Sequence, residues 1–210
     1  MWNETFVLAD RIKGVLIGCA GGLIAIATAT DVAGYADAAI LPLTILGVLA
    51  QTLIATAALR VGLTVEAQAA IRPQFARVFG IGLVSGLGIL LGGLFALIPG
   101  VFLLLRWWVV VPVALDRDLG FSEAMRESWR LTAPHWAPIL GLFLGLLAML
   151  VIPMAALFYV GAFDEEPMSL SMSLLVNLFT YGVTNLGTIS SVAVYRTIDQ
   201  SVPDLRSVFE

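Results

Sequence analysis

The chain has few of the residues from which catalytic and metal sites are usually built. Its 210 residues include one histidine, His135, and one cysteine, Cys19, and only 12% are charged. A zinc site needs several His or Cys ligands, and an intramembrane protease needs paired acids, a serine with a base, or histidine ligands. The sequence also lacks a Walker-type phosphate loop and a basic run that could follow a nucleic acid backbone. These absences predict a protein that is not an enzyme, holds no cofactor or metal and binds no nucleic acid.

Apolar residues are abundant instead, and they occur in long blocks. Hydrophobic residues make up 60% of the chain, against about 45–50% in a typical soluble protein. A helix of about 20 apolar residues crosses the hydrocarbon layer, where every backbone polar group must be bonded internally. The sequence therefore predicts one all-α polytopic membrane domain, without a soluble domain. Its six expected spans lie at about 12–30, 38–59, 77–98, 101–116, 134–160 and 171–195.

The positive charges follow this map. Every Lys and Arg except Arg106 lies at the start of the chain, in the second or fourth connection, or in the C-terminal tail. The charged residues of the first and fifth connections are all acidic: Asp31, Asp37, Asp164, Glu165 and Glu166. Because positively charged loops face the cytoplasm, we expect both termini on the cytoplasmic side of a bacterial-type inner membrane. This pattern needs an even number of spans, which favours counting the short fourth one, and a weak Ala-x-x-Arg repeat at the ends of the even spans groups the chain into three hairpins.

Two segments are predicted to be amphipathic elbow helices on the cytoplasmic surface. In residues 1–11, Asn3 is the expected cap, and one face carries Trp2, Phe6 and Ala9. Residues 121–132 show the amphipathic pattern more clearly.

In residues 121–132, Phe121, Met125 and Trp129 recur every four residues, with Ser122 as the expected cap and Pro134 as the stop. The other face carries two expected ion pairs, Glu123–Arg126 and Glu127–Arg130. This helix lies on the membrane surface in our main interpretation and docks a partner protein in the alternative.

Small residues recur every fourth position in three of the spans. Such faces let helices approach closely in lipid. They serve packing inside the bundle in our main interpretation, with the odd-numbered spans making the inner contacts, and self-association in the alternative. The faces are Gly14-Gly18-Gly22, Gly82-Gly86, Gly88-Gly92 and Ala137-Gly141-Gly145.

The sixth span carries a polar stripe. Its members follow spacings of three and four residues and therefore share one face: Ser173, Asn177, Tyr181, Thr184, Thr188, Ser191 and Tyr195. Polar side chains are costly against acyl chains, so this face should point into protein or water. Interhelical hydrogen bonding is one explanation, and the wall of a hydrophilic path is the other.

Arg106 is an ionisable residue predicted to lie within a span. Its side chain should extend toward the outer surface past Ile98, with Trp107 and Trp108 as interface anchors. The alternative is a site for a lipid phosphate or for a carboxylate, which would have to come from Asp31, Asp37 or the acids at 164–166.

Residues 98–132 resemble a segment of a known family. They share a Pro-Gly turn at Pro99-Gly100, then Arg106, the mid-helix Pro112, and an Ala-x-x-x-Ser-Trp-x-Leu-Thr helix from Ala124 to Thr132. This pattern is similar to bacterial six-helix proteins of the YciC kind and to the membrane domain attached to some glycerophosphodiester phosphodiesterases. The resemblance implies the six-helix fold and no catalysis, because the phosphodiesterase activity of those proteins belongs to a separate soluble domain.

The expected function is that of a non-enzymatic accessory or scaffold subunit, which binds protein partners or lipids in the membrane. The candidate lipid or partner residues are Arg106, Trp107, Trp108, Phe121, Met125, Arg126, Trp129 and Arg130. The alternative is a transporter or channel for a small molecule or lipid that uses Arg106 and the polar face of the sixth span. The candidate residues of that path are Asn177, Tyr181, Thr184, Thr188 and Ser191.

Overall fold

A computed structural model describes residues 1–95, 97–159 and 169–199, and every regular element in these ranges is helical. The elements are α1 (Trp2–Arg11), α2 (Lys13–Val32), α3 (Ala36–Arg60), α4 (Val65–Ala70), α5 (Phe75–Phe95), α6 (Leu97–Arg106), α7 (Val110–Asp116), α8 (Phe121–Thr132), the 3-10 turn Ala133–His135, α9 (Trp136–Tyr159) and α10 (Leu170–Asp199). The expected acidic connection at 164–166 and Arg206 of the tail lie outside the described residues.

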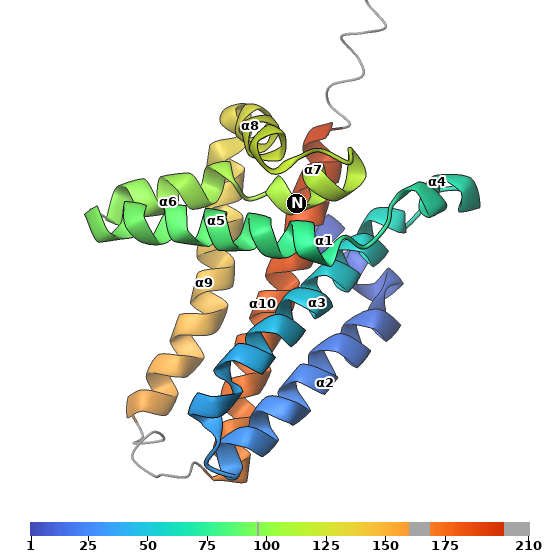
Figure 1. Ribbon diagram of the computed structural model, residues 1–210. Helices are drawn as coiled ribbons and strands as arrows, with labels where there is room; N and C mark the ends of the chain where they lie inside the picture. The colour runs from blue at the N-terminus through green and yellow to red at the C-terminus, as the bar shows by residue number, and fades with distance from the viewer. Residues whose placement is uncertain (96, 160–168, 200–210) are drawn as a thin grey trace, which may run out of the picture.

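Four long helices, α2, α3, α9 and α10, run between two ends of the molecule (Figure 1). The helix α10 is central, because it contacts α2, α3 and α9 as well as α1. At one end, which we call the charged end, the Arg196 side chain of α10 donates to the Val61 carbonyl just after α3. At the other end, the far end, α2 connects to α3 beside the start of α10, and a Ser173–Asp31 hydrogen bond joins α10 to α2.

Five segments of the described chain are long and apolar enough to cross a membrane, which indicates a membrane protein. They are Lys13–Val32, Ala36–Arg60, Phe75–Leu94, Ile98–Asp116 and Phe121–Tyr159. The last segment joins α8 to α9. The helix α10 is not among the five, because the polar residues of its stripe lower its mean hydropathy. The sixth span therefore stays a prediction.

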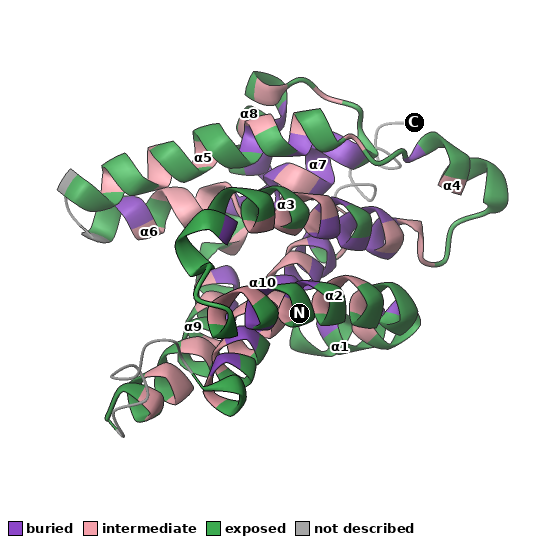
Figure 2. Ribbon diagram, turned by 60° about the horizontal axis from the view of Figure 1, so that its bottom comes forward, coloured by how far each residue is buried: buried purple, intermediate pink, exposed green. Residues whose placement is uncertain are grey.

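The helices α5 and α6 pack together as a hairpin that lies across the long helices near the charged end (Figure 1). Its outer apolar residues are exposed, including Leu90 at 69% and Leu94 at 80% (Figure 2). The expected third and fourth spans coincide with two of the five apolar segments, Phe75–Leu94 and Ile98–Asp116, but they lie across the long helices rather than along them. High hydropathy predicts contact with lipid or core, but it carries no information on the direction of a helix.

The fourth predicted span is two helices rather than one. The helix α6 ends at Arg106 and α7 begins at Val110. The expected turn at Pro99-Gly100 is also wrong, since both residues lie in the first turns of α6. Proline is tolerated there because the first backbone N–H groups of a helix have no intrahelical partner. The backbone of Gly100 instead packs against Gly93 of α5, where a side chain on Gly100 would come within 2.8 Å of the Gly93 nitrogen.

The hairpin has basic residues near both of its ends, on the same side of the molecule. It enters after Arg77 and returns before Arg117, and both of these arginines lie at the charged end. The basic residues therefore gather at one end whether four or six helices cross the membrane. The charge pattern is therefore compatible with both numbers, and it does not decide whether the fourth predicted span crosses the membrane.

The two predicted elbow segments are helical, with differences at their caps and faces. In α1, Asn3 lies inside the helix. Trp2 and Phe6 share one side as expected, with 6.1 Å between their ring centres, while the residues buried by the rest of the protein are Thr5 and Leu8. The helix reaches across to α9, where the Trp2 ring lies against Gly145. The burial of Thr5 and Leu8 follows from the contact of α1 with α10.

In α8, the N-cap is Gly120 instead of Ser122, and the helix ends at Thr132, just before Pro134. Its buried residues are Ala124, Ser128, Leu131 and Thr132. This face packs against α7 and the end of α6.

The small-residue faces divide into two groups. A β-carbon added at Gly14, Gly18, Gly22, Gly82 or Gly86 would meet no described atom of another helix within 4 Å. The expected inner packing through these faces is therefore not seen. By contrast, Gly88 and Gly92 of α5 lie close against α6, and Gly145 of α9 lies close against α1.

The buried core lies toward the charged end, where α3, α7, α8 and α10 meet. Ile54, Val113, Ala124 and Val194 are all 0% exposed. Away from this core the long helices present Leu, Ile and Val to their surroundings, as Figure 2 shows by the green faces of α2 and α3. The fold thus places its main buried core at the charged end, where α8 also packs.

Candidate functional site

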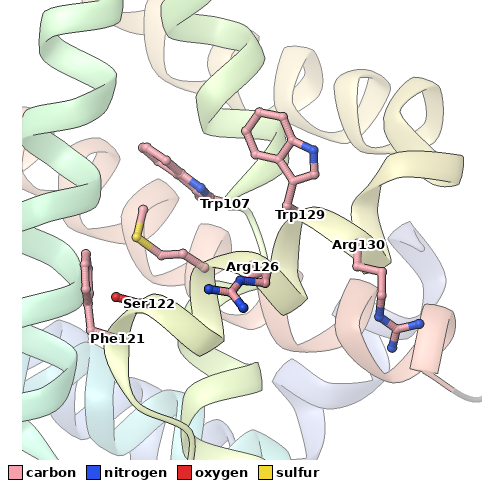
Figure 3. A pocket seen from close by; sticks show the side chains of 7 residues that line it. Trp107, Phe121, Ser122, Arg126, Trp129 and Arg130 are labelled. Atoms are coloured by element: carbon pink, nitrogen blue, oxygen red, sulfur yellow. The ribbon is translucent and has the colours of Figure 1, made fainter.

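A groove of about 690 Å³ runs along α8 at the charged end. We call it the α8 groove. It is lined by Trp107, Phe121, Ser122, Met125, Arg126, Trp129 and Arg130. In Figure 3, Trp107 and Phe121 point toward one space, and Arg126 and Arg130 lie along its edge. The groove thus combines an apolar wall with a basic rim.

Hydrogen bonds from α8 to the end of α6 hold the groove in place. The backbone carbonyl of Arg106 accepts from Ser128 Oγ at 2.9 Å and from Thr132 Oγ1 at 3.1 Å. A carbonyl at the C-terminus of a helix has no intrahelical partner. The Ser128 hydroxyl satisfies it and fixes α8 against α6, while Thr132 shares its single proton with the nearer Ser128 carbonyl at 2.8 Å. The neighbouring face of α8 stays free to line the groove.

The Arg106 side chain lies against a pair of aromatic rings, Phe102 and Trp129, whose centres are 5.5 Å apart. Its guanidinium carbon is 4.9 Å from the Phe102 ring centre and 5.4 Å from the Trp129 ring centre. Both distances are within the range of cation–π attraction. Its Nε and Nη1 atoms are buried and make no hydrogen bond within the described part of the chain. The expected extension of Arg106 toward the outer surface is wrong, because α6 lies crosswise and brings Arg106 to α8.

The basic rim contains one compensated and one uncompensated arginine. Arg130 pairs with Glu127, as the spacing predicts, and Glu127 also binds Arg117. Arg126 is exposed and makes no hydrogen bond or ion pair with any residue that the structure describes. The predicted partner of Arg126, Glu123, accepts instead from the backbone N–H of Gly120 at 3.3 Å.

The structure gathers most of the predicted lipid or partner residues in one place. Six of the eight line the α8 groove, and Arg106 lies against one of them, Trp129. Trp108 is separate. It packs edge-on against Phe143 of α9, with 6.1 Å between the ring centres, and lines a different cavity.

The predicted polar stripe of α10 follows two other cavities. The first, of about 510 Å³, lies between α2, α3 and α10 at the far end, and both Asn177 and Tyr181 line it. We call it the acidic cavity because Asp31 and Asp37 also line it. The second, the inner cavity of about 300 Å³, is lined by Thr184, Thr188 and Ser191 among others. Arg106 lines neither cavity, so the structure does not join it to the stripe.

Both ends of the stripe make hydrogen bonds to other helices. Ser173 and Asn177 donate to Asp31 of α2 at 2.8 and 2.7 Å. Ser191 donates to the Trp108 carbonyl at 2.6 Å, and Tyr195 donates to Asp116 at 2.5 Å.

The middle of the stripe behaves differently. Thr184 donates to the Thr180 carbonyl and Thr188 to the Thr184 carbonyl, both within α10. Interhelical bonding therefore explains the ends of the stripe, and the middle faces a cavity.

Sequence reasoning missed several residues of these sites. The expectation that Asp31 could pair with Arg106 is not met, because the Asp31 carboxylate is bonded to α10 at the opposite end of the molecule. Gln51 of α3 lines both the acidic and the inner cavity. A glutamine within an otherwise apolar span was a usable signal, because a polar side chain in lipid needs a partner or water.

A cluster of ion pairs lies at the charged end. Arg117 bridges Glu127 of α8 and Asp199 of α10. Asp118 accepts from Gln74 Nε2 at 2.9 Å and from Arg77 Nη1 at 2.6 Å, and these bonds lower the pKa of the Asp118 carboxyl. The cluster ties the segment between α7 and α8 to the start of α5 and to the end of α10.

No family model, curated protein or solved structure matches this chain. The chemistry of the described residues therefore carries the functional argument. Among these residues, no three His, Cys, Asp or Glu side chains are grouped so that they could hold a metal ion.

Proposed function

We propose that this chain is a non-enzymatic integral membrane protein that acts as a scaffold by holding an anionic phospholipid in the α8 groove. The proposal places the protein in a bacterial-type inner membrane, with the charged end and both termini on the cytoplasmic side. It also includes the suggested membership of the YciC-like family. Of the residues that carry that resemblance, Trp129 lines the groove, and Ser128 bonds α8 to the Arg106 carbonyl.

The observation that carries the proposal is the uncompensated Arg126 on the rim of an apolar groove. A phospholipid has an anionic phosphate directly beside its acyl chains. Phe121, Met125 and Trp107 offer an apolar wall for the upper part of a chain, and Arg126 offers charge-assisted hydrogen bonds to the phosphate. Tryptophan at this level is typical of the interface between membrane and water.

The basic surroundings favour an anionic lipid over a zwitterionic one. Arg106 lies behind Trp129, within cation–π distance of it. Arginines near the surface of an anionic membrane contribute about 1 kcal/mol each to binding. A lipid with net negative charge gains from this field, whereas a zwitterionic lipid gains little.

Native mass spectrometry of the protein released from lipid nanodiscs tests the proposal. Discs contain phosphatidylglycerol and phosphatidylcholine in equal amounts. We expect wild-type protein to retain phosphatidylglycerol preferentially, and Arg126→Gln to reduce that preference by roughly 5-fold, which corresponds to about 1 kcal/mol.

Arg72→Gln is the matched control. Arg72 is also exposed and makes no hydrogen bond or ion pair among the described residues, but it does not line the groove. Equal retention of the two lipids by the wild type, or unchanged retention by Arg126→Gln, would refute the lipid site. A protein that co-purifies at fixed stoichiometry, and is lost with Trp129→Ala, would assign the groove to a protein partner instead.

A further inference from the structure

The acidic cavity lies at the far end, away from the α8 groove, and is not used by the proposed function. It occupies about 510 Å³ between α2, α3 and α10. Its polar lining residues come from all three helices: Asp31, Asp37, Thr44, Gln51, Asn177 and Tyr181. A volume of this size is within the range of small-molecule sites.

Asp31 is held in a fixed position at this cavity. Ser173 Oγ and Asn177 Nδ2 both donate to its Oδ2 atom, which leaves Oδ1 without a hydrogen bond among the described residues. Ser173 is 0% and Asn177 7% exposed, so the support is built into the helix contact. Asn177 makes all of its described side-chain hydrogen bonds through Nδ2, so its own carbonyl oxygen has no donor there. Two acceptor atoms thus remain available at one place.

No described residue that lines the cavity compensates its charge. Its lining includes two carboxylates and no Lys or Arg. The groups that bond Asp31 are neutral, so its negative charge is stabilised without being cancelled. A carboxylate in this state favours a cation that can donate hydrogen bonds.

The rest of the lining distinguishes an organic cation from a metal ion. Ile40, Leu43 and Val48 of α3 form an apolar part of the wall. Calcium takes six to eight oxygen ligands and magnesium needs an octahedral set, whereas no group of three acidic, His or Cys side chains that could hold a metal occurs among the described residues. An ammonium ion with an apolar body fits both halves of the lining.

We propose that the acidic cavity binds an organic ammonium ion, with its charged nitrogen at Asp31 and its apolar body against α3. This site is additional to the α8 groove and does not depend on the proposed lipid function. The ammonium group could belong to a free amine or to the ethanolamine headgroup of a membrane lipid, and the experiment below separates these two sources.

Calorimetric titration of the full chain in phosphatidylglycerol nanodiscs with benzylammonium tests this site, with protein-free discs as the blank. We expect benzylammonium to bind at least ~10-fold more tightly than the neutral benzyl alcohol, and Asp31→Asn to weaken benzylammonium binding by ~10-fold or more. Asparagine keeps an oxygen that can accept from Ser173 and Asn177, so this variant removes the charge and preserves the helix contact. Asp10→Asn is the matched control, because Asp10 is exposed and pairs with Lys13 away from the cavity.

A second variant tests the cavity without changing its charge. Gly47 lines the cavity, and no other residue's atoms lie within 4 Å of the position of its missing side chain. Gly47→Leu should therefore fill the space and abolish binding, while Gly21→Leu, at an exposed glycine of α2 with equally open surroundings, should leave it unchanged. The proposal would be overturned if the wild type bound no benzylammonium or bound benzyl alcohol equally well. It would also be overturned if neither Asp31→Asn nor Gly47→Leu changed benzylammonium binding.

Repeating the titration in discs with phosphatidylethanolamine identifies the source of the ammonium group. A fall in the apparent affinity of the wild type means that the lipid headgroup competes for Asp31. An unchanged affinity means that the site takes a free amine. Both results support the ammonium site, and neither depends on the outcome at Arg126.

Discussion

The indole ring of Trp107 lies directly on the backbone of Gly88, where α6 meets α5. A β-carbon on Gly88 would come within 2.7 Å of the ring atom Cζ3 of Trp107. Trp107 also lines both the α8 groove and the inner cavity. The absence of a side chain at Gly88 therefore decides the position of the wall between these two hollows.

Replacing Gly88 should expose this dependence. We expect Gly88→Ala to lower the free energy of unfolding by about 1–3 kcal/mol, because the large ring has to move. Gly86→Ala is the control on the same helix, where the side chain would meet open space. Alanine is the better helix former, so Gly86→Ala should be neutral or stabilising by up to about 1 kcal/mol. Unfolding in mixed micelles measures both variants, and equal effects would contradict the close contact.

The hydroxyl groups of α8 that bind the Arg106 carbonyl should contribute to stability. Ser128 is 0% exposed and donates to this carbonyl at 2.9 Å. We expect Ser128→Ala to cost about 1 kcal/mol and to speed hydrogen exchange in α8. Ser122→Ala, at an exposed serine of the same helix, should change neither quantity. A Ser128→Ala variant with native exchange rates would show that this hydrogen bond does not hold α8 in place.

The ends and the middle of the α10 stripe should respond differently to substitution. Asn177 is bonded to α2, so Asn177→Ala should destabilise the protein by about 1 kcal/mol. Thr184 bonds only within its own helix, and Thr184→Val should stay within about 0.5 kcal/mol of the wild type. Urea or detergent unfolding monitored by circular dichroism compares them. A large loss with Thr184→Val would mean that its hydroxyl has an interhelical partner.

Acid should weaken the contact between Asp118 and the start of α5. The bonds from Gln74 and Arg77 lower the pKa of Asp118 in the folded protein, relative to about 3.9 in an unfolded chain. The resulting stabilisation is fully present above the unfolded value and is lost as the pH falls through the folded value. The unfolding temperature of the wild type should therefore fall more steeply than that of Asp118→Asn below about pH 4. Parallel acid profiles of the two proteins would show that the contact adds nothing to stability.

The α8 groove could be anticipated from sequence because its information is local. Phe121, Met125 and Trp129 recur every four residues, and that spacing places them on one side of any helix. The position of Arg106 beside Trp129 could not be anticipated in the same way. It depends on the crosswise direction of α6, and a helix that is apolar on all sides has no preferred face from which to infer its direction.

The hydrogen bonds between Asp31 and α10 at the acidic cavity could not be predicted from sequence for a different reason. The stripe spacing identified the face of α10 that carries Asn177, but its partner Asp31 lies 146 residues away in the sequence. Nothing local to either residue specifies the other. The prediction of one continuous helix for the fourth span was wrong, because neither hydropathy nor composition marks the end of α6 at Arg106.

The hairpin of α5 and α6 has a consequence for how the protein responds to its membrane. Arg77 and Arg106 lie near the two ends of the hairpin, and from Val78 to Leu105 it contains no charged residue, so this stretch can change its depth in the bilayer without moving a charge of its own through hydrocarbon. Its depth is then governed by hydrophobic mismatch, at fractions of a kcal/mol per Å. Longer or shorter acyl chains should shift the hairpin, and Trp107, seated on Gly88, carries that shift directly to the mouth of the α8 groove.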